Sequence, residues 1–464
     1  MIVKKISCLL ITAVLCGLLL AGCREAEVKS VKKVSQDTSA GGPERPEADL
    51  SAVRTDISRL SVSEDVQVVG LGEASHGVGE YHLMKGEVFK ALVEHNGCRS
   101  FVIEGDFGGA LKVEEYIHGG PGTAKEAVKE IGFAIYDTQE LVDLVEWMRA
   151  YNDKISVESN SGQDTKSDED LISASKGQNS QAAVDETLHF YGMDMQRVDN
   201  NKEYLFDQLE QSAPAIYETY CAALQGLTDE ARMEPEPDRE MLQKAQADIE
   251  GLLKDMDAAE QEIVSAIGQT AFDRARECAN TLREFTELSL CADSDYNTMR
   301  DQYMFEKVRW FMEHESGLLL INGHNGHVGR TPVSGYTCLG QLLADSLGEK
   351  YFAIGTDAEQ TVFNSQDTEG NFAVREVSNR NLLNGQLDGM DSDYYYVDFA
   401  AVLEDEGWQK VAGEKQKLVT LNVGISEGQL KSPMYYTASV VPKETFDGMI
   451  VFRKVSPTTL LLDD

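Results

Sequence analysis

What this sequence of 464 residues has little of already excludes several classes of protein. Basic residues are scarce, with 42 Lys and Arg against 79 Asp and Glu, and the formal net charge is -37. A surface this acidic repels phosphates, so we expect no nucleic-acid partner. The eight cysteines are scattered without any Cys-x-x-Cys pair, which argues against a disulfide scaffold and a cysteine zinc site. Beyond the first residues, no apolar run approaches the roughly 20 residues that cross a membrane.

The first 22 residues have the pattern of an export signal. Lys4 and Lys5 precede an apolar run over 6–20, which is shorter than an ordinary membrane-spanning helix. The run ends in Leu-Ala-Gly-Cys, and this ending resembles the bacterial lipoprotein signal. The resemblance implies cleavage before Cys23, lipidation of its thiol and an outward-facing anchor in the cell membrane, which two or more acyl chains hold stably. The alternative is an uncleaved N-terminal anchor with an incidental cysteine.

Composition and periodicity divide the rest of the chain into a discontinuous α/β domain with two insertions. Residues 23–50 are polar and lack an apolar period, which predicts a flexible tether. A similar stretch at 153–185 lies between recognisable core elements, which predicts a disordered surface insertion. Residues 199–291 have a helical period and predict a helical subdomain. The α/β domain then comprises 51–198 and 292–464.

Short apolar runs alternate with helical patterns in both parts of the α/β domain. Such runs are typical of strands that are buried on both faces of a parallel sheet. We therefore predict an α/β fold in which helices cover a mostly parallel sheet and a helical subdomain is inserted. The predicted strands are 66–72, 100–106, 188–195, 317–323, 351–357, 394–400, 420–425 and 449–455, and two predicted helices are 81–96 and 138–151.

Polar clusters follow four of the predicted strands, at the point where each strand ends. The carboxyl ends of parallel strands meet at one edge of a sheet, where ligands bind in such folds. Clusters at this edge are able to converge on one cleft, as a hydrolase needs if a base, an orienting carboxylate and an oxyanion stabiliser are to meet. The clusters contain Glu73 and His76, Glu104, Asp194 and Gln196, and His324 and His327 with Arg330 just beyond.

Six ordered motifs carry a resemblance to a known family. They are GEASHG, VIEGDF, FYGMDMQ, NTMRDQYM, INGHNGHVGR and FDGMIVFRKVSP, and they lie between about residue 55 and the end of the chain. Together they resemble the erythromycin esterase family. The resemblance implies hydrolysis of a macrolide lactone ester by directly activated water, without a covalent serine intermediate.

The resemblance also implies roles for the residues of the motifs. His76 is the implied general base, and Glu73 and Glu104 orient it and raise its basicity. The implied role of His324 and His327 is to bind or polarise the substrate carbonyl. A base and an oxyanion donor contribute about 10² to 10⁴ and about 10² to 10³ in rate, so the set is expected to act together.

Further residues complete the expected site. Arg300, in the Met-Arg-Asp part of the fourth motif, is implied to stabilise the developing oxyanion. We expect substrate contacts from Lys85, Asp194, Gln196 and Arg330. The family usually has an arginine where this chain has Lys85, which keeps the charge but loses the bidentate fork. This difference bears on the macrolide substrate more than on hydrolysis as such.

Two other chemistries compete for the same residues. The pairs Glu73 with His76 and His324 with His327 have spacings that occur in metal sites, so a divalent ion is an alternative. Both pairs follow strands and lie among glycines rather than on one helical face, so we expect neither an obligatory metal nor a cofactor. Ser75 is a possible nucleophile, but it lacks the G-x-S-x-G elbow.

The sequence thus predicts a surface-anchored hydrolase of a small-molecule ester of the macrolide type, with a role in antibiotic resistance. It indicates no particular oligomeric state. The alternative is a non-catalytic envelope lipoprotein that uses the same fold to bind a small molecule or a carbohydrate. The two hypotheses differ in whether replacing His76 abolishes product formation or leaves ligand affinity unchanged.

Overall fold

The computed structural model describes residues 46–163, 186–230, 238–367 and 370–461. The predicted signal, the lipidation site Cys23 and most of the predicted tether lie outside the described residues. Among the described residues, no helix combines the length and the apolar character that crossing a membrane needs.

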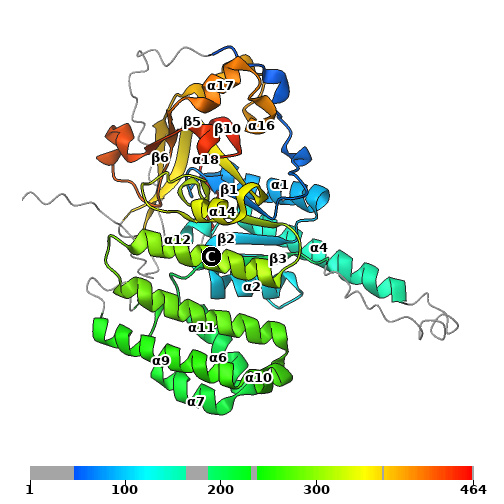
Figure 1. The fold of residues 1–464 in the computed structure, drawn as a ribbon, viewed down its shortest axis with the longest axis vertical. Helices are drawn as coiled ribbons and strands as arrows, with labels where there is room; N and C mark the ends of the chain where they lie inside the picture. The colour runs from blue at the N-terminus through cyan, green and yellow to red at the C-terminus, as the bar shows by residue number, and fades with distance from the viewer. Residues whose placement is uncertain (1–45, 164–185, 231–237, 368–369, 462–464) are drawn as a thin grey trace, which may run out of the picture.

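One eight-stranded sheet forms the centre of the protein (Figure 1). The spatial order is β3-β2-β4-β1-β5-β10-β7, with β6 paired to the outer half of β5. Only β6 and β7 run antiparallel to their neighbours in this described sheet, so the predicted fold class is confirmed. The strands are β1 (Val68–Glu73), β2 (Ser100–Asp106), β3 (His189–Asp194), β4 (Leu319–His324), β5 (Tyr351–Gln366), β6 (Phe372–Ser378), β7 (Tyr394–Asp398) and β10 (Gly448–Val455).

Helices cover both faces of the sheet, and a group of helices lies beyond one face (Figure 1). The helices of the α/β part are α1 (Gly79–Asn96), α2 (Phe107–Ile117), α3 (Ala124–Lys129), α4 (Gln139–Gln163), α12 (Tyr296–His314), α13 (Asn325–Val328), α14 (Leu339–Leu347), α15 (Leu382–Gly385), α16 (Phe399–Val402), α17 (Glu406–Gly413) and α18 (Pro442–Thr445). The helices of the group are α6 (Asp199–Ser212), α7 (Pro214–Ala223), α9 (Arg239–Ala258), α10 (Glu260–Ile267) and α11 (Gln269–Leu290), within the residues predicted to form a helical subdomain.

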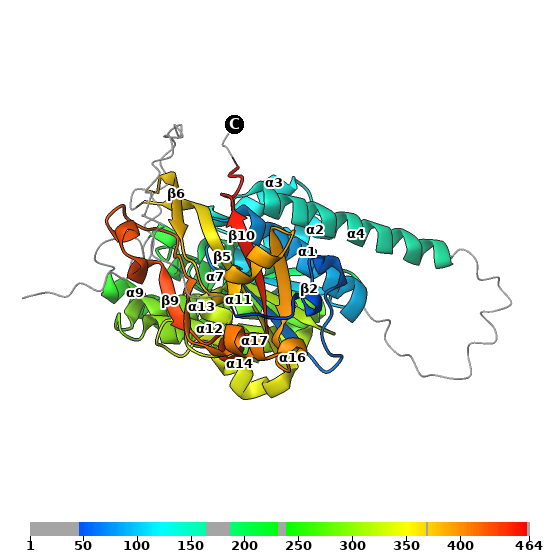
Figure 2. The same cartoon turned by 90° about the horizontal axis from the view of Figure 1, so that it is seen from above.

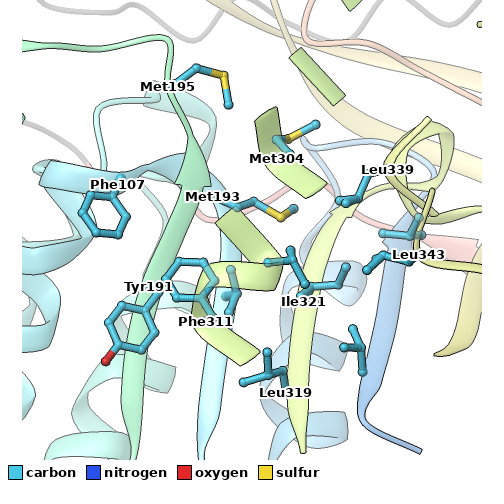
Figure 3. Packing of buried hydrophobic residues seen from close by; sticks show 14 of the residues in the cluster. Phe107, Tyr191, Met193, Met195, Met304, Phe311, Leu319, Ile321, Leu339 and Leu343 are labelled. Atoms are coloured by element: carbon cyan, nitrogen blue, oxygen red, sulfur yellow. The ribbon is translucent and has the colours of Figure 1, made fainter. Parts of the chain in front are cut away.

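The strands distribute their side chains between two hydrophobic cores, one on each face of the sheet. In β1, Val68 packs into one core and Val69 into the other, as the two-residue period of a strand requires. Figure 3 shows the first core, where Met193 of β3 and Ile321 of β4 pack with Phe311 of α12. Burial of each large apolar side chain stabilises the fold by about 1.5–3 kcal/mol. The cores thereby fix the strands and the positions of their polar ends.

Two elements extend past their predicted ends. β5 continues beyond residue 357 to Gln366, because its second half pairs with β10 on one side and β6 on the other. α4 continues to Gln163, inside the predicted insertion at 153–185, and Figure 2 shows this helix extending away from the body of the protein. The rest of that predicted insertion, 164–185, lies outside the described residues.

The predicted strand at 420–425 is wrong. The strand β8 (Gln416–Val419) ends just before it and pairs with β9 (Thr437–Val440) in a separate two-stranded sheet. Leu421 instead donates its backbone N–H to the carbonyl oxygen of Ala74 at 2.8 Å, so this segment supports the loop after β1. The last residues of the predicted tether are also packed, because Trp408 donates Nε1–H to the carbonyl oxygen of Asp49 at 2.8 Å.

Candidate active site

The order of the strands places four polar side chains in a row along the carboxyl edge of the sheet. β3, β2, β4 and β1 are consecutive neighbours, and they carry Asp194, Glu104, His324 and Glu73 at or near their ends. Glu73 and His324 are paired in the register of β1 and β4. Because neighbouring strands lie about 4.8 Å apart, side chains from sequence positions far apart meet in one site.

The loop after β1 approaches its neighbours closely, and glycines make this possible. A Cβ on Gly72 would lie 2.3 Å from Oδ1 of Asn325, and one on Gly77 would lie 1.9 Å from the carbonyl oxygen of Asn364. Neither glycine is among those with positive φ. A side chain at either position would clash with α13 or β5, so close packing of the loop requires glycine there. The backbone at these positions is not left-handed.

His76 is held by Glu73 in the orientation of a general base. Nδ1 of His76 lies 2.8 Å from Oε1 of Glu73, so this nitrogen carries the proton and Nε2 keeps its lone pair. The backbone carbonyl of His76 accepts a hydrogen bond of 2.9 Å from Nε2 of His82. Burial and Lys85 lower the pKa of His82 to about 3, so His82 is neutral, and its Nδ1 accepts from the hydroxyl of Thr138 at 3.1 Å.

Lys85 reaches the site from α1, but it lies behind Glu73. Its side chain is fully buried, and Nζ lies 2.9 Å from Oε2 of Glu73. Burial lowers the pKa of Lys85, and the Glu73 carboxylate opposes this effect. Burial would raise the pKa of Glu73, but Lys85 and His76 outweigh it and hold that pKa well below its usual range. Lys85 therefore keeps Glu73 ionised, a role different from the substrate contact predicted for it.

Arg300 of α12 binds the carboxylates of two strands. Nη2 lies 2.8 Å from Oε1 of Glu104 and 2.5 Å from Oδ2 of Asp194, and Nε donates to the same Asp194 oxygen at 3.2 Å. Gln196 donates its amide to that oxygen as well, at 2.7 Å. Asp194 and Gln196 thus lie in the site, where they hold Arg300. These contacts occupy Nε and Nη2 of the predicted oxyanion stabiliser.

His327 is an imidazolium between two carboxylates. Nδ1 lies 2.9 Å from Asp301, and Nε2 lies 3.2 Å from Oε1 of Glu104. Burial opposes the charge, but Asp301 and Glu104 outweigh it and raise the pKa of His327 to about 10. Nη1 of Arg300 lies 3.1 Å from Nε2 of His327. Both nitrogens are donors, and the two side chains bind the same oxygen of Glu104, Arg300 through Nη2. The short distance therefore brings two cations together on one carboxylate without a hydrogen bond between them.

His324 is neutral and presents an N–H to the site. Burial, together with His76 and His327, lowers its pKa to about 3. Its Nδ1 accepts the backbone N–H of Gly326 at 3.1 Å, which places the ring proton on Nε2. The His324 and His76 rings have centroids 5.4 Å apart. The backbone N–H of His324 donates to Oε2 of Glu104 at 2.8 Å, so Glu104 orients His324 rather than His76.

The site therefore contains two kinds of group. Lys85, Arg300 and His327 are cations, and carboxylates bind each of them. His76 and His324 are held by single contacts at Nδ1, so that one offers a lone pair at Nε2 and the other a proton. Attack of water on a carbonyl group requires a lone pair that takes a proton from the water. It also requires a nearby donor, such as a neutral N–H, that stabilises the negative charge on the carbonyl oxygen.

The structure brings together the six predicted catalytic residues, with Lys85, Asp194 and Gln196 around them. Arg330 is elsewhere: Nη1 donates to the carbonyl oxygen of Tyr351 at 2.6 Å and to Oδ2 of Asp447 at 3.0 Å. Tyr351 begins β5, so Arg330 lies toward the opposite edge of the sheet. The prediction that Arg330 contacts substrate at this site does not fit that position.

Three residues in or beside the site were missed by the sequence analysis. Asp301 follows Arg300 directly, and its position in the Asn-Thr-Met-Arg-Asp motif was the available signal. His82 has no motif of its own and is recognised only through its contact with the His76 backbone. Tyr136 packs edge-on against His76, with ring centroids 6.2 Å apart, and no pattern in the sequence marks it.

A cluster with metal-like spacing lies at the other end of β3. In the described part of the chain it consists of Glu114, His118 and His189. The Glu114 carboxylate already binds Nδ1 of His189 and Nη2 of Arg274, both at 2.8 Å. In the candidate site, Glu73 and His76 bind each other. Of the second pair that suggested a divalent ion from the sequence, His324 accepts the N–H of Gly326 and His327 binds Asp301 and Glu104.

Comparisons with known proteins bear on the family and the fold of this chain. The sequence profile described as erythromycin esterase matches residues 93–455. Erythromycin esterase type II of Escherichia coli is 23% identical over 329 residues, which cover 63% of this chain and 68% of that protein. The matched profile begins after Glu73 and His76, so it does not include these two residues.

Two solved structures have a similar fold. A succinoglycan biosynthesis protein superposes with a TM-score of 0.67 at 20% identity, over 86% of this chain and 90% of that one. A mutant of erythromycin esterase EreC in its open conformation gives a TM-score of 0.59 at 14% identity, over 89% of this chain and 99% of that one. The family profile matches well over half of the length of this chain, and the chain therefore belongs to the erythromycin esterase family.

Proposed function

We propose that this protein hydrolyses a carboxylic ester with water that His76 activates. Membership of the erythromycin esterase family supports hydrolysis as the reaction class. The observation that carries the proposal is the 2.8 Å contact between Nδ1 of His76 and Glu73, which leaves Nε2 available as a base. Among the described residues, Nε2 of His76 has no hydrogen-bond partner.

In the proposed reaction, water gives a proton to Nε2 of His76 as its oxygen bonds to the ester carbonyl carbon. The electron pair of the carbonyl π bond moves to the carbonyl oxygen, which Nε2–H of His324 stabilises. When the double bond re-forms, the bond to the alkoxy oxygen breaks, and the leaving alcohol takes the proton from His76. The products are a carboxylic acid and an alcohol, and His76 returns to its neutral form.

The charged groups prepare this reaction before substrate arrives. Glu73 stabilises the imidazolium that His76 becomes, and Lys85 keeps Glu73 ionised. Glu104 fixes the backbone of His324, while Arg300 and His327 hold Glu104. Because these pairs are already formed in the fold, little reorganisation is needed as charge develops.

A macrolide lactone is the substrate that we propose, with a role in resistance to such antibiotics. The names of the Escherichia coli relative and of the EreC structure support an ester of this class. Lys85 fills the position where the family resemblance leads us to expect arginine, and its contact is with Glu73. Its replacement of arginine therefore bears on how Glu73 is held rather than on direct recognition of the macrolide.

We also propose that the protein is exported and held at the outer face of the cell membrane by lipid on Cys23. The N-terminal sequence supports this, and Cys23 lies outside the described residues. A Cys23→Ser variant is expected to lose labelling by a fatty-acid analogue and to leave the membrane fraction. A variant that stays labelled and membrane-bound would contradict the anchor.

Mass spectrometry of macrolides with different ring sizes tests the proposed reaction. We expect the parent protein to add water to at least one of them and His76→Ala to lose about 10²–10⁴ in rate. His95→Ala is the matched control, because His95 is exposed and bonds only the carbonyl of Ser58 among described residues.

The same assay separates the alternatives. A macrolide that binds the parent and His76→Ala equally, with no product from either, would favour a non-catalytic binding protein. Loss of turnover after chelation, restored by one divalent ion, would favour metal-assisted hydrolysis. Failure to hydrolyse any macrolide, with turnover of simpler esters, would refute the macrolide substrate and leave the reaction class intact.

A further inference from the structure

Tyr136 has a buried hydroxyl that nothing in the described protein satisfies. The residue ends a short 3-10 turn (Ala134–Tyr136) between α3 and α4, and its side chain is fully buried. In the part of the chain that the structure describes, no group hydrogen-bonds to this hydroxyl. Buried polar groups are nearly always paired, so an unpaired one in a native fold calls for a physical reason.

The ring of Tyr136 forms one wall of the site. It meets His76 edge-on with centroids 6.2 Å apart, and it lies 6.0 Å from the ring of His82. Nζ of Lys85 lies 4.8 Å from the ring centroid, a distance typical of a cation over an aromatic face. Tyr136 therefore packs against His76, His82 and Lys85. His82 holds the backbone of His76, and Lys85 keeps Glu73 ionised.

The hydroxyl lies in the field of both halves of the site. Burial raises the pKa of Tyr136 well above its usual value, and the charges that act on it most are Glu73 and Glu104, followed by Arg300 and Asp194. Glu73 belongs to the His76 half, whereas the other three form the Arg300 half. The phenol therefore remains a neutral O–H donor over the whole pH range in which the enzyme would work.

We propose that the Tyr136 hydroxyl donates a hydrogen bond to the substrate carbonyl oxygen and forms, with Nε2–H of His324, the pair of donors that binds the developing oxyanion. This inference rests on the proposed ester hydrolysis. The cations of the site are bound by carboxylates, whereas these two hydrogens are not committed to close partners: Nε2 of His324 has only a 3.5 Å contact to Thr420. Burial of the hydroxyl is shared by the whole site, since His76 and His324 are buried as well.

The hydroxyl takes part without changing its covalent state. As water adds to the carbonyl carbon and His76 takes the water proton, negative charge gathers on the carbonyl oxygen. The Tyr136 O–H shortens its hydrogen bond to that oxygen and keeps its own proton. When the oxyanion collapses and the alcohol leaves, the hydrogen bond relaxes.

Tyr136→Phe removes the hydroxyl and retains the ring, so it tests this role directly. We expect kcat to fall about 10²-fold, as when one oxyanion donor is removed, with KM within about threefold. Tyr395→Phe is the matched control, because Tyr395 is also fully buried but donates its hydroxyl to the carbonyl of Leu383 at 2.9 Å. This control is expected to keep kcat and to lower the denaturant midpoint, whereas Tyr136→Phe leaves the midpoint unchanged or higher.

The outcomes separate this inference from the function on which it rests. An active parent with an equally active Tyr136→Phe variant would overturn the donor role and leave hydrolysis in place. A midpoint for Tyr136→Phe that falls as far as that of Tyr395→Phe would also overturn it, with or without turnover, because the hydroxyl would then have a structural partner. A parent that hydrolyses no ester while His76→Ala behaves identically would overturn the proposed function and this role with it.

Discussion

The candidate site and a second buried charge cluster in the described protein differ, because only the first has the properties of an active site. The second is the Lys307 cluster, which consists of Lys307, Glu277, Thr281 and Glu284 between α11 and α12. Nζ of Lys307 lies 2.6 Å from Glu277, 2.8 Å from Thr281 and 2.9 Å from Glu284. Three oxygens thus surround the ammonium, one for each of its three protons, which leaves no proton facing a ligand.

Each region holds one more carboxylate than it has cations among the described residues. The candidate site sets Glu73, Glu104, Asp194 and Asp301 against Lys85, Arg300 and His327. In the Lys307 cluster, burial raises the pKa of Glu284 to about 7, so a proton neutralises the surplus below that pH. In the site, the pKa values of Glu73 and Glu104 are held low. Surplus negative charge therefore remains where His76 becomes positive in the proposed hydrolysis.

The comparison indicates that donors and acceptors without close partners distinguish the candidate site from a structural network. In the Lys307 cluster each proton of the ammonium faces an oxygen, whereas the site leaves the His76 lone pair, the His324 N–H and the Tyr136 hydroxyl without close partners in the described structure. Burial and charge are similar in the two regions. Neither property alone would have identified the functional one.

The largest effects are expected when each buried ammonium is removed. Lys85→Met and Lys307→Met should each lower the free energy of unfolding by about 3–5 kcal/mol, because each leaves a buried carboxylate without its cation. Only Lys85→Met should also lower kcat/KM strongly, since Glu73 would then lose the cation that keeps it ionised. Chemical denaturation and ester hydrolysis measured on the same preparations check both effects.

Lys85→Arg controls for the charge at that position and should retain more activity than Lys85→Met. If folded Lys307→Met protein lost activity as severely as Lys85→Met, the distinction between a structural and a functional cluster would fail. Equal stability of Lys307→Met and the parent protein would instead show that the Lys307 cluster is not a net stabiliser.

A smaller effect concerns the pH dependence of stability in the Lys307 cluster. The pKa of Glu284 rises from an ordinary 4.5 to about 7 on folding, so the folded protein keeps a proton that the unfolded chain releases. This contribution is fully present below about pH 4.5 and is lost as pH rises through about 7. The difference in unfolding free energy between the parent and Glu284→Gln should therefore shift against the parent between pH 5 and 8. A constant difference over that range would show that Glu284 is ionised throughout.

Much of the site could be predicted from the sequence, because it depends on a general property of parallel sheets. Strands that end in polar residues present them at one edge, so the convergence of Glu73, Glu104, Asp194 and His324 follows once the strands are recognised. The continuous apolar runs likewise predict a sheet that is buried on both faces. The helical subdomain is predictable from its 3.6-residue period.

Other features depend on which strands are neighbours, and the sequence does not carry that information locally. The order β3-β2-β4-β1 decides that Arg300 binds Glu104 and Asp194, and that Glu104 orients His324 and not His76. Lys85 lies on a helix face that could equally have met solvent. The segment at 420–425 has the composition of a strand, but its backbone supports the loop after β1.

The span of the charge pairs has a consequence for how the chain reaches its native state. Arg300 and Glu104 lie 196 residues apart in sequence, and the backbone of His324 and Glu104 lie 220 apart. A partly assembled protein that buried one member of such a pair alone would bear an uncompensated charge, at a cost of several kcal/mol. The network thus penalises incomplete intermediates and links the two separated halves of the α/β domain into one cooperative unit.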